Sequence, residues 1–368
     1  MLSAACVIAL ACMQAAWAAT ITDLGTLGGT YSAAYGINAS GQVVGWASTA
    51  GDAAFDAFLY TPGSGMTNLG TFGGPGSEAT GINASGQVVG WASTAGNAQD
   101  AFLYTPGSGM IDLGPGQATG INDSGQVVGW LFNPPIPFLY AQGSGMIDLG
   151  MLLGSHYAWA YGINDSGQVV AWGGFDALLY TPGGGTLDLG PVGWTDGVWT
   201  DGVPTVSVPT GINDSGQVVG YSLTGGSGPL DPFLYTPGSG MIDLGTLGGI
   251  GGSEALGIND SGQVVGQART ASGLQDAFLY DDGVMTDLNS LLPEGSGWLL
   301  EEATAINDSG EIVGYGTIDG QTHAFLLDTG TTSDSATPEP SSLALFGGGV
   351  ALLAMMRKQR QRGKSFTR

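Results

Sequence analysis

One ten-residue motif recurs seven times along this chain of 368 residues, and it restricts the fold more than any other feature. The copies read GINASGQVVG at Gly36 and Gly81, GINDSGQVVG at Gly120, Gly211 and Gly257, GINDSGQVVA at Gly162 and AINDSGEIVG at Ala305. Successive copies are 45, 39, 42, 49, 46 and 48 residues apart. A period of this size is typical of repeat architectures, in which each repeat is one unit of supersecondary structure.

Each repeat contains the pattern of four short strands. In the third repeat, apolar segments at residues 118–122 and 126–130 flank Asp123-Ser124-Gly125, a turn in which glycine supplies a positive φ. Two further strands are predicted at residues 137–140 and 146–150, separated by another glycine-rich turn. Four short strands in about 45 residues are typical of a β-propeller blade.

The two ends of the repeat array complement each other. Residues 20–25 read TITDLG, a fourth strand that lacks the first three, and residues 324–327 read AFLL, a third strand that lacks a fourth. Pairing the N-terminal strand into the last blade would close the ring and remove an exposed sheet edge. We therefore predict an all-β fold, a closed seven-bladed β-propeller of four-stranded blades, for residues 19–328. A β-helix or an open array would also repeat, but an open array needs no complementary ends.

The charge distribution excludes one class of partner. Between Asp23 and Asp334 the chain holds 30 acidic residues and a single basic one, Arg269. Such a surface repels phosphates, so no nucleic acid is expected to bind, whereas cations are attracted.

The N-terminal segment is apolar and predicts export. Residues 1–18 end in Ala16-Trp17-Ala18, which is typical of a cleaved secretory signal peptide. The usual basic start is missing, so a membrane anchor is the alternative, and Cys12 fits a lipid-attachment site poorly. Both cysteines lie in this segment, so the mature chain has neither disulfides nor thiol chemistry.

The C-terminal segment has three parts in a fixed order. A polar linker at residues 329–337 precedes Pro338, Glu339 and Pro340, an apolar run at residues 343–356 and a basic end. The tail, residues 338–368, resembles the PEP-CTERM sorting signal of Gram-negative bacteria. The resemblance implies export across the inner membrane, processing by an exosortase-type enzyme, and a cell-surface or extracellular location. An ordinary single-span tail anchor is the alternative, although the apolar run is short for a transmembrane helix.

The repeats themselves resemble the HAF family of bacterial extracellular repeats. The tripeptide of that family stands intact once, at His323-Ala324-Phe325, and the resemblance spans about residues 20–330. It implies an extracellular location but carries no established chemistry, so no catalytic residue follows from it.

Two repeated polar positions were weighed as binding sites. An aspartate precedes the third strand in five repeats, at Asp56, Asp100, Asp176, Asp231 and Asp276. The simpler interpretation is that these aspartates cap the start of the strand. The alternative is an acidic rim that binds calcium or polar sugars. No other cofactor is expected. The aspartate of the Asn-Asp-Ser-Gly turn is replaced by Ala39 and Ala84 in two repeats, which favours a turn over a calcium loop. The asparagine, which matches a glycosylation pattern, is also better explained as a turn former.

Aromatic residues follow two patterns. A tryptophan follows the second-strand valines at Trp46, Trp91, Trp130 and Trp172, where packing between blades is favoured over sugar stacking. The longest interval contains the doubled sequence WTDGVWTDGV, which makes Trp194, Asp196, Trp199 and Asp201 a candidate binding loop.

Catalysis finds little support, because the mature chain has two histidines, no cysteine and no nucleophile motif on a suitable turn. We predict an exported, noncatalytic structural or interaction protein of the bacterial envelope or extracellular polysaccharide matrix. The alternative is a secreted carbohydrate-active enzyme with paired carboxylates at the propeller mouth.

Overall fold

The computed structural model describes residues 19–132, 134–154, 157–190, 206–223 and 230–330. Contacts divide the chain into one unit at Met1–Gly330 and another at Thr331–Arg368. The predicted signal peptide, the linker beyond Gly330 and the sorting tail all lie outside the described residues. Of the helices that the structure describes, none has the length and apolar character needed to cross a membrane.

The described residues form an all-β fold, as predicted. Their helices are the short segments η1 (Ala50–Asp52), α1 (Gly150–Leu153) and η2 (Leu288–Leu291). The rest of the regular structure consists of strands, which follow one order in every repeat. The first strand ends just before the Asn-(Asp/Ala)-Ser-Gly turn, and the second begins just after it. First strands are β2 (Gly28–Ile37), β6 (Gly73–Ile82), β9 (Gly109–Ile121), β13 (Ala158–Ile163), β17 (Ser207–Ile212), β21 (Glu254–Ile258) and β25 (Trp298–Ile306).

Second and third strands form the middle of each sheet. Second strands are β3 (Val43–Thr49), β7 (Val88–Thr94), β10 (Val127–Leu131), β14 (Val169–Gly173), β18 (Val218–Leu223), β22 (Val264–Arg269) and β26 (Glu311–Ile318). Third strands are β4 (Phe55–Thr61), β8 (Gln99–Thr105), β11 (Ile136–Ala141), β15 (Asp176–Thr181), β19 (Leu230–Thr236), β23 (Gln275–Asp281) and β27 (Gln321–Asp328).

Fourth strands flank the third strands on the other side. They are β5 (Gly65–Gly70), the first half of β9, β12 (Gly145–Asp148), β16 (Gly185–Asp188), β20 (Gly240–Asp243) and β24 (Val284–Asp287). The last third strand, β27, pairs instead with β1 (Thr20–Asp23), in the antiparallel register Thr20↔Asp328 to Asp23↔Phe325. The N-terminal segment therefore occupies the position that the sequence assigned to it, beside the last repeat.

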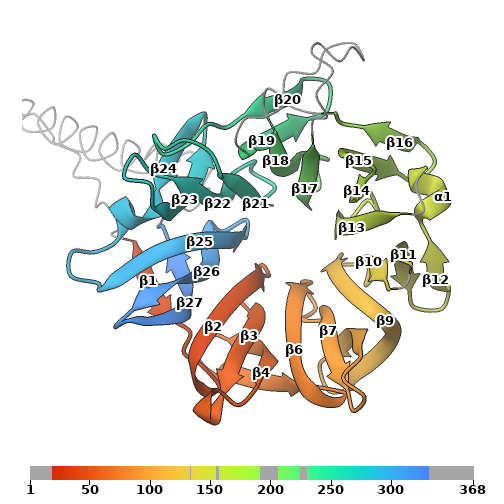
Figure 1. Ribbon diagram of the computed structural model, residues 1–368, viewed down its shortest axis with the longest axis horizontal. Helices are drawn as coiled ribbons and strands as arrows, with labels where there is room; N and C mark the ends of the chain where they lie inside the picture. Colours follow the sequence, from red (N-terminus) through yellow and green to blue (C-terminus); the bar gives the residue numbers. More distant parts are fainter. Residues whose placement is uncertain (1–18, 133, 155–156, 191–205, 224–229, 331–368) are drawn as a thin grey trace, which may run out of the picture. The chain divides into compact units, whose positions relative to one another are not determined.

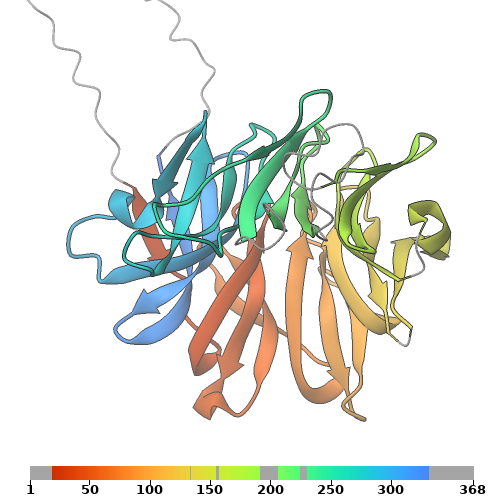
Figure 2. The same ribbon diagram turned by 45° about the horizontal axis from the view of Figure 1, so that its top comes forward.

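The sheets are arranged around a common axis, with the first strands innermost and the fourth strands outermost (Figures 1 and 2). This is a β-propeller-like arrangement. Hydrogen-bonded ladders of the described residues form one 15-stranded set and three separate four-stranded sheets, so no single sheet runs around the axis. The 15-stranded set arises because single parallel pairs, Tyr31↔Thr322 and Phe55↔Gly76, connect neighbouring sheets and because the long strand β9 pairs with both β8 and β10.

The hydrophobic core lies between neighbouring sheets. One cluster joins Val44 and Ala57 of the first repeat to Val88 and Phe102 of the second. The third-strand phenylalanines are fully buried in such clusters: Phe58, Phe102, Phe138, Phe233, Phe278 and Phe325. A repeat cannot bury these side chains alone, so each sheet depends on its neighbour for stability.

Candidate functional site

The Asn-(Asp/Ala)-Ser-Gly turn is held by its asparagine. In the first repeat, Oδ1 of Asn38 accepts hydrogen bonds from the backbone N–H groups of Ser40 and Gln42, both at 3.0 Å. Gly41 has a φ of +71°, the left-handed conformation that the sequence predicted for this position. The turn places the end of each first strand at the central axis.

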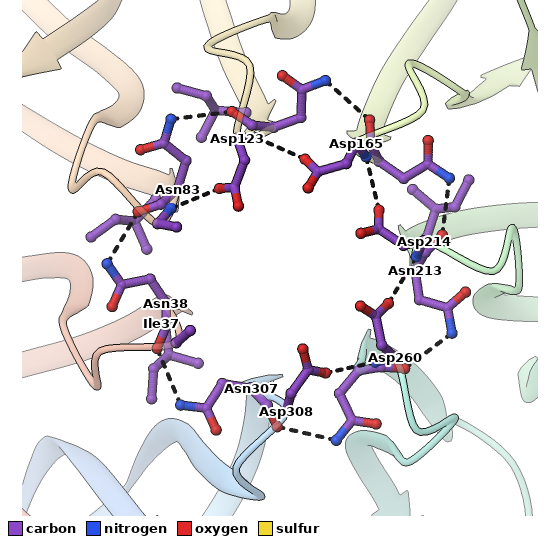
Figure 3. A pocket seen from close by; sticks show the side chains of 18 of the residues that line it. Ile37, Asn38, Asn83, Asp123, Asp165, Asn213, Asp214, Asp260, Asn307 and Asp308 are labelled. Atoms are coloured by element: carbon purple, nitrogen blue, oxygen red, sulfur yellow. Dashed lines mark hydrogen bonds between the residues drawn. The ribbon is translucent and has the colours of Figure 1, made fainter.

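The same asparagine side chain also binds the next repeat. Nδ2 of Asn38 donates to the carbonyl oxygen of Asn83 at 3.1 Å, and this bond recurs from repeat to repeat until Asn307 donates to the carbonyl oxygen of Asn38 (Figure 3). We call these seven residues the central ring: Asn38, Asn83, Asn122, Asn164, Asn213, Asn259 and Asn307. All seven are buried. The sequence pattern predicts a turn former at this asparagine but gives no sign of its role between repeats.

A second set of bonds supports the central ring from within the first strands. Each first strand bulges where a residue has no direct partner on the second strand. In the second repeat the bulged residue is Thr80, whose hydroxyl donates to the carbonyl of Val89 in its own sheet and of Ala118 in the next one. Thr119, Thr210 and Thr304 make equivalent pairs of bonds.

Five carboxylates lie on the inner side of the central ring (Figure 3). They are Asp123, Asp165, Asp214, Asp260 and Asp308, and each accepts a hydrogen bond of 2.8–2.9 Å from the corresponding backbone N–H of the preceding repeat. The remaining two positions, which are adjacent, hold Ala39 and Ala84. These five exposed aspartates form an acidic crescent around one part of a cavity of about 230 Å³.

The acidic crescent is suited to attracting cations. Like charges on one rim reinforce each other's field, and the backbone N–H donors fix the carboxylates in place. Across the part of the chain that the structure describes, no group of three or more His, Cys, Asp or Glu side chains has the arrangement of a metal site. The five carboxylates share one hydrogen-bond pattern, since each accepts from the backbone of the preceding repeat.

The five aspartates of the predicted acidic rim lie at equivalent positions near the start of the third strands. Their burial differs. Asp100 and Asp276 retain 9% and 8% of their exposed area, whereas the other three, Asp56, Asp176 and Asp231, are half-buried. Binding of cations by this set stays a prediction.

Asp56, Asp100, Asp176 and Asp276 each lie near an acidic or amide residue of the fourth strand, and we call these combinations the outer pairs. In the first repeat, Nδ2 of Asn68 donates to Oδ2 of Asp56 at 2.7 Å. In the fourth, burial and the nearby carboxylate of Asp188 raise the pKa of Asp176 to about 6. Burial raises the pKa of Asp100 too, and Asp112 adds to this effect.

The last outer pair contains a histidine in place of the aspartate. Nδ1 of His323 lies 2.9 Å from a carboxylate oxygen of Asp23, so it links β27 to the N-terminal strand β1. This histidine begins the HAF tripeptide, and its Nε2 is buried without a hydrogen-bond partner. The one intact tripeptide therefore lies where the N-terminal strand β1 pairs with β27, the last third strand.

The recurring tryptophans take part in aromatic packing. Phe55 lies between Trp46 and Trp91, with ring centroids 5.5 and 5.9 Å apart, and so connects the first repeat to the second. Trp130 packs against Tyr161 of the next repeat at 5.9 Å. The candidate binding loop with Trp194, Asp196, Trp199 and Asp201 lies outside the described residues.

A pair of half-buried polar groups lies on β25 and β26, the first and second strands of the seventh repeat. The hydroxyl of Tyr315 donates to Oε2 of Glu302 at 3.0 Å. Burial, with smaller contributions from Glu254 and Glu301, raises the pKa of Glu302 to about 7, although the tyrosine hydrogen bond acts in the opposite direction. No sequence motif marks this carboxyl, so it could not be predicted as a site residue.

Solved structures with a similar fold include two lyases. A streptogramin B lyase structure aligns with a TM-score of 0.52 at 12% identity, over 85% of this chain and 98% of that one. The virginiamycin B lyase from Staphylococcus aureus aligns with a TM-score of 0.54 at 11% identity, over 84% and 99% of the two chains. At such identities the likeness shows the β-propeller-like fold alone. No curated protein matches the chain significantly in sequence.

The C-terminal segment has a clear counterpart. Residues 336–360 match the PEP-CTERM protein-sorting motif, which includes Pro338, Glu339 and Pro340. Signals of this kind are processed by exosortase and direct proteins of Gram-negative bacteria to the surface or the extracellular space. The match does not extend to the repeats, whose resemblance to the HAF family stays a prediction. The chain therefore carries a PEP-CTERM sorting motif and is an exported, surface-sorted protein.

Proposed function

We propose that the described body is a closed ring of seven four-stranded blades, the last of which is completed by β1. Three contacts between the last repeat and the first support this closure. Asn307 donates to the carbonyl of Asn38, and Thr304 donates to the carbonyl of Ala34. A hydrophobic cluster also joins Val313 and Ala324 to residues of the first repeat, as other clusters join consecutive repeats.

On this scaffold, the protein is a noncatalytic binding protein of the bacterial surface or extracellular polysaccharide matrix. The acidic crescent is the observation that carries this function, because it presents five fixed carboxylates on an otherwise uniform ring. Divalent cations held loosely there would bridge the protein to anionic polysaccharide. Before processing, the sorting tail would hold the protein at the inner membrane. The remaining segments would be a signal peptide at residues 1–18 and a polar linker at residues 329–337.

The experiment compares two triple variants of the full chain with the same change in charge. Asp165→Asn, Asp214→Asn and Asp260→Asn keep the oxygen that accepts the backbone hydrogen bond. The control variant carries Asp282→Asn, Glu294→Gln and Asp319→Asn, all at exposed positions away from the central ring. Retention on alginate beads is measured with and without millimolar calcium.

We expect calcium-dependent retention of the unmodified chain and of the control variant, and its loss from the acidic-crescent variant. Equal loss in both variants would mean that net charge alone governs retention. No retention in any condition would contradict the proposed function.

The acidic rim at Asp56, Asp100, Asp176, Asp231 and Asp276 is a second proposal for calcium, tested separately. Calcium bound there would raise the melting temperature of the protein, and the acidic-crescent variant would keep this rise. An unchanged melting temperature in the presence of calcium would remove the proposal.

A carbohydrate-active enzyme is the second candidate function, and Glu302 is the observation that favours it. A carboxyl with a pKa of about 7 is matched to general acid catalysis near neutral pH, and Glu254 and Glu301 are the nearby carboxylates. Release of reducing ends from exopolysaccharide, abolished by Glu302→Gln, would establish an enzyme. Binding without turnover would support the noncatalytic function.

A further inference from the structure

A second cavity lies between the sixth and seventh repeats, separate from the acidic crescent. Its volume is about 270 Å³, and its lining includes Gln267, Leu274, Asp276, Leu299, Glu301 and Tyr315. These residues belong to β22, β23, β25 and β26 and the turn before β23. The cavity is therefore formed by two neighbouring sheets, and its polar lining is rich in acceptors.

Asp276 is the unusual residue of this cavity. Its side chain is more than nine-tenths buried, and its Oδ1 atom has no hydrogen-bond partner in the structure. A buried carboxylate oxygen normally accepts hydrogen bonds, because its lost hydration is otherwise uncompensated. Burial raises the pKa of Asp276, and the carboxylates of Asp287 and Glu301 raise it further. The site thus concentrates negative charge that a positively charged group would stabilise.

The rim of the cavity is apolar. Leu274 and Leu299 are 59% and 43% exposed, and both lie beside the carboxylates in the same lining. Tyr315 adds an aromatic ring. Exposed leucines next to buried acids match a ligand with an aliphatic stem and a cationic end. A calcium ion would use the oxygens but not the leucines, and a compact amino sugar has no such stem.

We propose that this cavity binds an arginine side chain of a partner protein. The guanidinium would pair with the carboxylates of Asp276 and Glu301 and donate to the amide oxygen of Gln267, while the methylene groups would cover Leu274 and Leu299. Arginine suits the site better than lysine, because its planar group presents several donors in fixed directions. The protein itself offers almost no competitor, since Arg269 is the one basic residue between Asp23 and Asp334.

The test is a calorimetric titration of the full chain with two short peptides that differ in charge alone. One is acetyl-Gly-Arg-Gly-amide, and the other carries citrulline, which keeps the shape of arginine without its charge. We expect the arginine peptide to bind at least tenfold more tightly than the citrulline peptide. Equal binding of the two peptides, or binding of neither, would overturn the proposal.

Two variants locate the site. Asp276→Asn should weaken arginine binding at least tenfold, and Leu299→Ser should weaken it by a smaller factor. Asp100→Asn is the matched control, because Asp100 has the same position in the second repeat and similar burial but does not line this cavity. An unchanged affinity in Asp276→Asn, with thermal unfolding confirming that the variant is folded, would overturn the proposal.

The result is independent of the function proposed for the acidic crescent, although Asp276 also belongs to the acidic rim. The acidic-crescent variant should bind the arginine peptide as the unmodified chain does, because its substitutions lie in the turns that line the central cavity. Equal weakening by that variant and by Asp276→Asn would indicate a general effect of charge and would contradict the arginine site.

Discussion

The central ring and the outer pairs are built from residues of the same repeats, but they differ in uniformity. At the central ring, seven asparagines make the same bond to the next repeat at 3.0–3.1 Å. At the outer pairs, the equivalent positions hold an aspartate with an asparagine, an aspartate with an aspartate, or a histidine with an aspartate.

The difference teaches which repeated residues support the architecture. An asparagine that joins two repeats cannot change in one copy without losing both the bond to the next repeat and the bonds that hold its own turn. The outer pairs lie within one sheet and at its edge, so each can vary without affecting its neighbours. Uniform positions therefore carry stability, and variable positions carry differences in charge.

The largest effect is expected at the central ring. Asn213→Ala removes the bond to the carbonyl of Asn259 and two bonds to Gln217, and it leaves the half-buried backbone N–H of Gln217 without its acceptor. We expect a loss of about 2–4 kcal/mol in the free energy of unfolding. Urea denaturation followed by circular dichroism measures it. A loss no larger than that of a surface substitution would contradict the role assigned to the ring.

Aromatic packing between repeats should matter less. Phe55→Ala removes the ring that lies between Trp46 and Trp91, and the expected loss is about 1–2 kcal/mol because Phe55 is partly exposed. The same denaturation assay applies, with Phe175→Ala as the control, since Phe175 is more exposed. Similar losses in both variants would remove the packing role.

Substitution of Asp176 in the outer pairs should change the free energy of unfolding in a pH-dependent way. At neutral pH it should stabilise the protein, whereas the two substitutions above destabilise it. The pKa of Asp176, about 6, lies above its unfolded value of 3.8, so the folded state holds the proton more tightly and stability falls as the pH rises from about 4 to about 6. Asp176→Asn should abolish this fall. At pH 7 it should stabilise the protein by roughly 1 kcal/mol after allowance for solvent screening.

The first repeat offers the reverse of this substitution. Asn68→Asp would turn the hydrogen-bonded pair with Asp56 into two carboxylates, and should introduce the same fall in stability between pH 4 and 6. Melting temperatures across this pH range test both variants. If the melting temperatures of the two variants and of the unmodified chain change with pH in the same way, protonation of the outer pairs does not affect stability.

The smallest effect is expected at the acidic crescent. Asp214→Ala removes one hydrogen bond, from the backbone of Asp165, but also relieves repulsion among like charges. The first two repeats already have alanine at the equivalent position, at Ala39 and Ala84. We expect a change below about 1 kcal/mol, measured by urea denaturation at low and high salt. A loss as large as that of Asn213→Ala would mean that the carboxylates are structural.

The sequence predicts the strands well because their signals are local. The glycine turns, the alternating apolar residues and the complementary ends gave the all-β fold and the pairing of β1 with β27. The bonds between repeats could not be predicted in this way, since a turn-forming asparagine satisfies its own turn and gives no sign that its Nδ2 reaches Asn83. One signal was present: Asn38 and its equivalents persist where the next residue changes to alanine.

The candidate sites were harder to predict than the fold. The aspartates of the third strands were recognised as equivalent, but the burial of Asp100 and Asp276 depends on packing against neighbouring sheets. The elevated pKa of Glu302 likewise arises mainly from burial between strands, with smaller contributions from Glu254 on β21 and from the adjacent Glu301. Long-range contacts of this kind leave no pattern along one repeat.

Closure of the ring is the central claim, and hydrogen–deuterium exchange of the N-terminal strand tests it most directly. In a closed ring β1 is a fourth strand like β20, so the amides of Thr20–Asp23 that bond to β27 should exchange as slowly as the paired amides of Gly240–Asp243. Rapid exchange throughout β1, while β20 remains protected, would mean that the last blade is incomplete and the ring is open.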